Sequence, residues 1–248
     1  MKANGIFFDL DNTLFNYDRA FGLAAVQSFS ELCEEQMILG CAKENMRREW
    51  LKVFKTNCDR FWGDYECGAL SRLAYQKKRF IASLRSCGLE AESNRAALGF
   101  EERLREYIPS YCQLYAGVSE MLQDLFDRNM LIGIITNGAE TVQRKKIEAL
   151  NLTKWIMPQH IFISDEMEVQ KPDPAIFFKV QEQTNCGLPL YVGDSWDQDI
   201  YPAAKSGWKA VWLTTSESES LKTRSRLLDY RRAFSIYQLN QLIISYIE

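Results

Sequence analysis

The sequence predicts an α/β fold, in which a Rossmann-like parallel β-sheet has helices on both faces and carries an inserted α-helical cap domain. Short apolar runs alternate with helix-length segments from residue 131 onward, which is the pattern of strands joined by crossover helices. Residues 16–113, by contrast, contain almost no strand signal. The first apolar run, within "GIFFDLDNTLF", ends directly in two aspartates, Asp9 and Asp11. Buried carboxylates so close together require a compensating positive charge.

Five apolar runs have strand character. They are GIFFDL at 5–10, LIGIIT at 131–136, HIFIS at 160–164, LPLYVGD at 188–194 and WKAVWLT at 208–214. Residues 139–152 and 173–185 lie between the later runs and show roughly helical spacing of their apolar residues. Residues 216–232 are polar and are predicted to form a surface connection, and 237–248 a closing helix.

The segment 16–113 is too long for a single crossover and is large enough for a small domain. We therefore predict a catalytic domain formed by residues 1–15 and 114–248. Residues 16–113 form a helical cap, inserted after the first strand and lying over the end of that strand.

Composition excludes several classes of protein. The chain is 46% hydrophobic and 25% charged with a net charge of −3, which gives no electrostatic footprint for a nucleic acid polymer or an anionic membrane. The short basic cluster "QRKKI", residues 143–147, is interpreted as solvated surface. No apolar run reaches the roughly 18 residues needed to cross a bilayer, and the N-terminus does not resemble a signal peptide.

The seven cysteines are odd in number and lack CxxC pairing, so they are predicted to be free thiols in a reducing cytoplasm. The single histidine, His160, is interpreted as structural or surface, and a zinc site is not expected. We expect a cytoplasmic monomer or homodimer without a membrane partner.

Polar side chains gather at the predicted strand ends. In an open parallel sheet, ligands bind outside the carboxyl ends of the strands. The residues at or just beyond the ends of the first four runs are Asp9, Asp11 and Thr13; Thr136, Asn137 and Gly138; Lys171; and Asp194, Ser195, Asp197 and Asp199.

This set suits phosphoryl transfer to and from a carboxylate. Carboxylates bind Mg²⁺, and an aspartate can act as the nucleophile. The transferred group needs positive charge and donors in position, which Mg²⁺, Lys171, Thr136 and Asn137 supply. Asp11 is predicted to act as general acid and then as base, because residues i and i+2 of an extended strand point to the same side.

The segments "DLDNTL", "TNG", "KPDP" and "GDSWDQD", in this order, resemble the four motifs of the haloacid dehalogenase-like superfamily in its phosphatase branch. The resemblance implies that Asp9 is the nucleophile and Asp11 the acid/base. It implies a Mg²⁺ site formed by Asp9, the backbone carbonyl of Asp11 and Asp194, supported by Asp199.

The same resemblance implies that Thr136, Asn137 and Gly138 bind phosphate. Lys171 would neutralise the phosphate and the nucleophile. Asp197 is interpreted as a surface or helix-start residue. The position of the helical segment matches the cap of the superfamily's first subclass.

The cap segment "FWGDYECGALSRLAYQKKRF" resembles a segment of cytosolic 5'-nucleotidases of this superfamily that act on pyrimidine and non-standard nucleoside monophosphates. The matching residues are Trp62, Tyr65, Glu66, Gly68, Arg79 and Phe80. Arg79 is open to two interpretations, a substrate contact or a buried salt bridge within the cap.

The predicted function is Mg²⁺-dependent hydrolysis of a small phosphate monoester through an aspartyl-phosphate, with a nucleoside 5'-monophosphate as the expected substrate. A sugar-phosphate phosphatase and a phosphomutase remain alternatives. A dehalogenase is disfavoured, because it does not need the second acid, Asp11. A catalytically silent protein that binds a phosphate ligand is the alternative from a different class.

Overall fold

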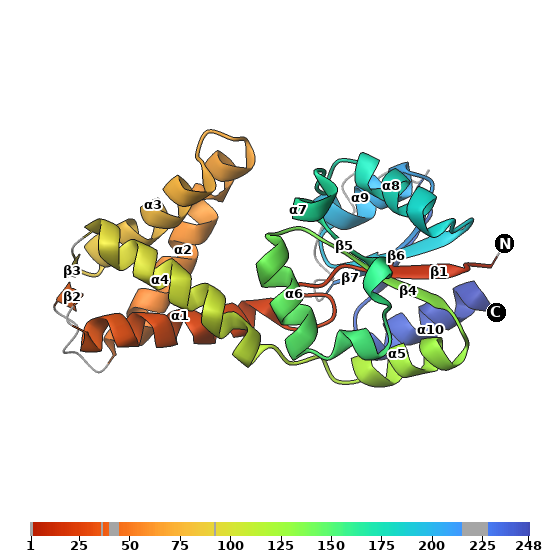
Figure 1. Cartoon of the computed structure of the whole chain (residues 1–248), viewed down its shortest axis with the longest axis horizontal. Coiled ribbons are helices and arrows are strands. Elements are labelled where there is room, and N and C mark those ends of the chain that lie inside the picture. The colour runs from red at the N-terminus through yellow and green to blue at the C-terminus, as the bar shows by residue number, and fades with distance from the viewer. Residues whose placement is uncertain (1, 36, 40–44, 92, 215–227) are drawn as a thin grey trace. The chain divides into compact units, whose positions relative to one another are not determined.

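A computed structural model describes residues 2–35, 37–39, 45–91, 93–214 and 228–248 of the protein (Figure 1). The chain divides into two compact units. One, here called the core unit, consists of Met1–Tyr17 and Cys112–Glu248. The other, the helical unit, consists of Asp18–Tyr111.

The core unit contains a six-stranded sheet in the order β5-β4-β1-β6-β7-β8, and every neighbouring pair is parallel. The strands are β1 (Gly5–Phe8), β4 (Leu131–Thr136), β5 (Ile161–Ile163), β6 (Pro189–Gly193), β7 (Lys209–Leu213) and β8 (Tyr230–Ala233). The predicted fold class is thus confirmed. Because β1 lies between β4 and β6, the residues that follow these three strands meet at one edge of the sheet.

Helices cover both faces of this sheet. In the core unit they are α5 (Val118–Asp127), α6 (Glu140–Ala149), α7 (Ser164–Met167), α8 (Ala175–Thr184), α9 (Tyr201–Lys205) and α10 (Ile236–Ile247), with a π-helix at Trp196–Ile200 and 3-10 turns at Leu152–Lys154 and Pro158–His160. Figure 1 shows α8 and α9 on one side of the sheet and α5 and α10 on the other. The closing helix predicted for 237–248 is α10.

The sheet is held by fully buried aromatic side chains. Phe7 of β1 packs against Phe162 and Trp208, with ring centroids 6.4 Å and 5.1 Å away. A Cβ atom at Gly133 in β4 would lie 2.5 Å from the Phe7 ring, which explains a glycine inside a strand. Phe7 and Gly133 are also partners in the register of β1 and β4.

Strand β8 was not predicted. Its first three residues belong to 216–232, the predicted surface connection, most of which falls outside the described residues. Its sequence, YRRA, has little apolar signal because it is an edge strand whose Arg231 faces solvent.

The helical unit contains α1 (Tyr17–Glu34, whose first residue belongs to the core unit), α2 (Met46–Glu66), α3 (Arg72–Ser86), α4 (Ser93–Tyr107) and a 3-10 turn at Ile108–Tyr111. Its core is a stack of aromatic rings, namely Phe29, Trp50, Phe54, Phe80 and Phe100. A short antiparallel pair, β2 (Ile38–Leu39) and β3 (Glu90–Ala91), was not predicted. Two residues per strand are too few to leave a pattern in the sequence.

Among the described residues, no helix is both long enough and apolar enough to cross a membrane. The prediction of free thiols holds for Cys58, Cys67, Cys87, Cys112 and Cys186. It is wrong for Cys33, which is disulfide-bonded. An odd number of cysteines excludes complete pairing, but it does not exclude one pair.

Candidate active site

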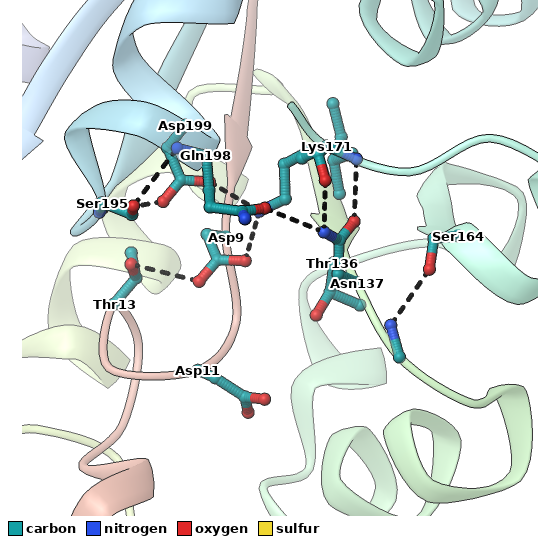
Figure 2. Close-up of polar contacts among 12 residues, drawn as sticks. Asp9, Asp11, Thr13, Thr136, Asn137, Ser164, Lys171, Ser195, Gln198 and Asp199 are labelled. Atoms are coloured by element: carbon teal, nitrogen blue, oxygen red, sulfur yellow. Dashed lines mark hydrogen bonds and ion pairs between the residues drawn. The ribbon is translucent and has the colours of Figure 1, made fainter. Parts of the chain in front are cut away.

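A buried ammonium group joins two carboxylates, one directly after β1 and one on the π-helix that follows β6. Lys171 Nζ lies 2.6 Å from Asp9 Oδ1 and 2.6 Å from Asp199 Oδ1 (Figure 2). Asp9, Lys171 and Asp199 are 6%, 3% and 1% exposed. Residues that are 162 and 28 positions apart in the chain therefore meet, as the strand-end argument predicts.

Asp9 continues the line of β1, and its backbone N–H donates to the carbonyl of Val192 on β6 at 2.8 Å. The Thr13 hydroxyl lies 3.5 Å from Asp9 Oδ2. Burial raises the pKa of Asp9 well above its ordinary value. The ammonium of Lys171 opposes this shift, and the charge of Asp199 adds to it. One ammonium thus offsets two buried carboxylates only in part.

Asp199 is fixed on three sides. The Ser195 N–H donates to its Oδ2 at 3.0 Å, and the Tyr191 hydroxyl lies 3.1 Å from its Oδ1. That hydroxyl also accepts a hydrogen bond from Lys171 Nζ at 2.9 Å. The position of Tyr191 in the apolar strand β6 predicts sheet packing and gives no sign of a polar partner. Its ring does pack in the sheet, while its hydroxyl completes the charged cluster.

The backbone of Lys171 is held by a side chain from the β4 end. Asn137 Nδ2 donates to the Lys171 carbonyl at 2.8 Å, and the Lys171 N–H donates to Asn137 Oδ1 at 3.0 Å. The second contact of Asn137 Nδ2 is with Gln198 Oε1 at 3.2 Å. The side chain predicted to donate to phosphate therefore anchors the loop that presents Lys171.

Three carboxylates form a set that could hold a metal ion. One oxygen from each of Asp9, Asp194 and Asp199 lies within 4.8 Å of the others. Burial and the charge of Asp199 raise the pKa of Asp194 to about 7. Oxygen donors of this kind suit Mg²⁺, and a cation among them would relieve the repulsion between the carboxylates.

Asp11 does not share the side of Asp9. Figure 2 shows its carboxylate pointing away from Asp9. The prediction that Asp9 and Asp11 point to the same side is wrong, because β1 ends at Phe8 and the chain then turns through Asn12, whose φ is 58°. The partner of Asp11 is Lys146, whose Nζ lies 2.7 Å and 2.9 Å from the two carboxylate oxygens.

The interpretation of residues 143–147 as solvated surface is wrong for Gln143 and Lys146, which are 1% and 3% exposed. Both lie on α6, and both approach predicted site residues. The missed signal was helical spacing. Gln143 and Lys146 share the buried face with Ile147 and Leu150, at i, i+3, i+4 and i+7.

Thr136 and Gly138 lie at the end of β4, and Thr136 contacts Gln143 of α6. Thr136 is 1% exposed. The Gly138 N–H donates to the Ser164 hydroxyl at 3.0 Å. Ser164, from the start of α7, was also missed, because a lone serine after a strand has no distinctive pattern.

Arg79 belongs to the helical unit and forms a buried salt bridge within it, as one of its two interpretations predicts. Its guanidinium lies 2.6 Å from Glu101 Oε1, and the side chains of the pair are 9% and 5% exposed. The guanidinium also lies over the rings of Tyr75 and Phe54, at 4.9 Å and 5.2 Å from their centroids.

Residues 6–213 match the profile of the family described as haloacid dehalogenase-like hydrolase. The chain is a haloacid dehalogenase-like hydrolase. This hydrolase is 29% identical over 224 residues to the pyrimidine 5'-nucleotidase YjjG of Escherichia coli, which covers 88% of this chain and 89% of YjjG. It is 29% identical over 211 residues to a glyceraldehyde 3-phosphate phosphatase of Pyrococcus furiosus, which covers 84% of this chain and 79% of that enzyme.

The fold of this hydrolase matches the crystal structure of the putative HAD-hydrolase YfnB from Bacillus subtilis, which was determined bound to magnesium. The TM-score is 0.72 at 23% identity, and the match covers 98% of this chain and 99% of YfnB. At 23% identity, this comparison shows only that the two hydrolases share a fold.

Proposed function

We propose that this hydrolase cleaves small phosphate monoesters through an aspartyl-phosphate formed on Asp9, and that its substrate is a nucleoside 5'-monophosphate. The observation that supports the proposal is the buried triad of Asp9, Lys171 and Asp199, in which one ammonium faces two carboxylates. Such a site gains stability when a cation and a phosphoryl group complete its charge balance.

In the first step, a carboxylate oxygen of Asp9 attacks phosphorus, and the bond between phosphorus and the ester oxygen breaks. Asp11 gives a proton to the departing oxygen, so the alcohol leaves neutral. In this proposal Lys171 and the Thr136 hydroxyl stabilise charge on the phosphoryl oxygens. In the observed conformation Asp11 points away from Asp9, so the step requires Asp11 to rotate toward the leaving group.

In the second step, a water molecule attacks the phosphorus of the aspartyl-phosphate. Asp11, now ionised, takes the proton of the water, and the bond between phosphorus and Asp9 breaks. Inorganic phosphate leaves, and both aspartates return to their starting states. Asp199 keeps Lys171 in place throughout, because it shares the ammonium with Asp9.

Asp9, Asp194 and Asp199 would hold Mg²⁺ in this proposal, with the Asp11 carbonyl as the further predicted ligand. When bound, the ion supplies positive charge that orients the phosphoryl group and offsets its developing negative charge. We also propose that residues 16–113 act as a cap domain, which selects among leaving groups, and that residues 1–15 and 114–248 form the catalytic domain.

The nucleotide is preferred as substrate because the cap segment at 61–80 resembles that of 5'-nucleotidases and YjjG is a pyrimidine 5'-nucleotidase. A sugar-phosphate phosphatase is the second candidate, since the relative from Pyrococcus furiosus acts on glyceraldehyde 3-phosphate. A phosphomutase would use the same two aspartates but would return the phosphoryl group to a sugar.

The test is a panel of nucleoside 5'-monophosphates, sugar phosphates and p-nitrophenyl phosphate, assayed with Mg²⁺ and with EDTA. We expect phosphate release that depends on Mg²⁺ and is fastest with a nucleotide. The variant Asp9→Asn is expected to lose activity by at least about a thousandfold, because an amide cannot form the covalent intermediate. Turnover of Asp9→Asn at the rate of the native protein would refute the nucleophile, and sugar phosphates that outrun every nucleotide would refute the substrate class.

A further inference from the structure

Gln143 on α6 contacts Thr136 and Asn137, two residues of the predicted phosphate-binding segment. Its side chain is 1% exposed. Its Nε2 lies 2.5 Å from the Thr136 hydroxyl oxygen and 3.1 Å from the Asn137 carbonyl oxygen. Neither the predicted motifs nor the proposed reaction assigns a role to this residue.

The Asn137 carbonyl fixes which end of the Gln143 amide faces the segment. A carbonyl oxygen can only accept a hydrogen bond, so the atom next to it must be the amide nitrogen. The same nitrogen has a second hydrogen, and that hydrogen points to the Thr136 hydroxyl oxygen. Thr136 is therefore the acceptor in its contact with Gln143.

Because Thr136 accepts the hydrogen bond from Gln143, its hydroxyl hydrogen remains available for another acceptor. A hydroxyl has a single hydrogen, and the side facing Gln143 is already occupied by an amide hydrogen. The Thr136 hydrogen must therefore point elsewhere. Among the described residues, no acceptor for it is found, although Thr136 is buried at the sheet edge that holds Asp9 and Lys171. A buried donor without an acceptor is costly, and a phosphoryl oxygen would satisfy it.

We propose that Gln143 is a positioning residue that turns the Thr136 hydroxyl into a donor for the phosphoryl group. The inference rests on the proposed function, in which Thr136 binds phosphate. Gln143 also holds the backbone between Thr136 and Gly138, because its Nε2 donates to the Asn137 carbonyl. A Cβ atom at Gly138 would lie 3.1 Å from the Gln143 side chain. Gly138 has a φ of 143°, so a glycine there permits both the turn and the close approach.

The experiment uses the full chain and measures kcat and KM for p-nitrophenyl phosphate and the inhibition constant of inorganic phosphate. Gln143→Met keeps the volume and removes the donor. Gln143→Glu places an acceptor where the donor was, so the Thr136 hydrogen turns toward it. The matched control is Lys145→Gln, an exposed position on the same helix whose charge change equals that of Gln143→Glu. Urea unfolding checks that each variant is folded.

We expect Gln143→Met to weaken phosphate binding by about tenfold and Gln143→Glu by about a hundredfold, the range for a lost or inverted buried hydrogen bond. Lys145→Gln is expected to stay within about twofold of the native protein, as is usual for surface changes. A role in packing alone would lower stability and leave the phosphate inhibition constant unchanged.

A double-mutant cycle with Thr136→Val measures how much of the effect of Gln143 depends on the Thr136 hydroxyl. In the Thr136→Val background, Gln143→Met is expected to change the phosphate inhibition constant by less than about twofold, because no hydroxyl remains to orient. Equal effects of Gln143→Met in both backgrounds, or none in either, would overturn the inference alone. A native protein that neither hydrolyses a phosphate ester nor binds phosphate would overturn the proposed function, and this inference with it.

Discussion

The ammonium group of Lys146 contacts both carboxylate oxygens of Asp11, at 2.7 Å and 2.9 Å. The ring of Tyr17 covers the same ammonium, with its centroid 4.4 Å from Nζ. Lys146 is 3% exposed, whereas the side chain of Asp11 is 26% exposed. A lysine this deeply buried depends on its carboxylate partner, so Asp11 has a structural role in addition to the one proposed for it in catalysis.

Replacing Asp11 with alanine is expected to lower the free energy of unfolding by about 1–2 kcal/mol, because a buried ammonium is left without its partner and the partial exposure of Asp11 moderates the cost. The double variant Asp11→Ala with Lys146→Met is expected to recover most of this stability, since no buried charge remains. It is not expected to recover phosphatase activity. Urea unfolding beside an assay separates the two roles, and a double variant less stable than Asp11→Ala would contradict the argument.

The close approach of Gly193 to Asp199 gives a second prediction. A Cβ atom at Gly193 would lie 2.5 Å from Asp199 Cβ and Cγ, so Gly193→Ala must displace Asp199 from Lys171 and Ser195. We expect a loss of about 2–3 kcal/mol in the free energy of unfolding, as for other overpacked sites, together with a large loss of activity.

The matched control for Gly193→Ala is Gly187→Ala, because a Cβ atom at that exposed position meets nothing within 4 Å. It is expected to leave activity unchanged. Native activity in Gly193→Ala would mean that Asp199 need not stay where the structure places it.

The strand-end rule explains why much of the site could be predicted. Asp9, Lys171 and Asp199 follow different strands, yet a parallel sheet brings such ends to one edge whatever their separation in sequence. The order of apolar runs and helix-length segments therefore predicts both the fold class and the proximity of Asp9, Lys171 and Asp199.

What could not be predicted depends on local geometry. The direction of Asp11 depends on a turn through Asn12 that an extended-strand argument does not include. Lys146 and Gln143 are polar residues in a basic segment, and only their partners at the sheet edge explain their burial. A pattern of residue types does not reveal a partner more than a hundred positions away, such as Asp11 for Lys146.

The protein's single histidine makes a clean probe of pH dependence. Burial lowers the pKa of His160 below its ordinary value of 6.5, and a hydrogen bond with the backbone of Ile132 opposes the shift in part. Because the folded-state pKa is the lower one, His160 contributes stability above about pH 6.5, and this contribution is lost as the pH falls through the folded pKa.

We expect the Hε1 signal of the one imidazole in a proton NMR titration to give a midpoint below 6.5, and the midpoint to return to about 6.5 in urea. His160→Gln is expected to be more stable at pH 5, relative to pH 8, than the native protein, because it has no imidazole to protonate. A midpoint above 6.5 would mean that a carboxylate partner, rather than burial, controls His160.

The ion pair of Arg79 and Glu101 gives a last prediction, which decides between the two interpretations of Arg79. Both side chains are buried in the helical unit, and Arg79 Nη2 lies 2.6 Å from Glu101 Oε1. Glu101→Leu leaves a buried guanidinium unpaired and is expected to lower the free energy of unfolding by about 3 kcal/mol, whereas Arg79→Met combined with Glu101→Leu is expected to regain most of that loss.

If Arg79 serves the ion pair alone, the double variant keeps the native KM for a nucleoside 5'-monophosphate. If Arg79 contacts substrate, the stable double variant shows a raised KM for the nucleotide but not for p-nitrophenyl phosphate. We expect the first result, because the guanidinium is already engaged by Glu101 and by the rings of Tyr75 and Phe54.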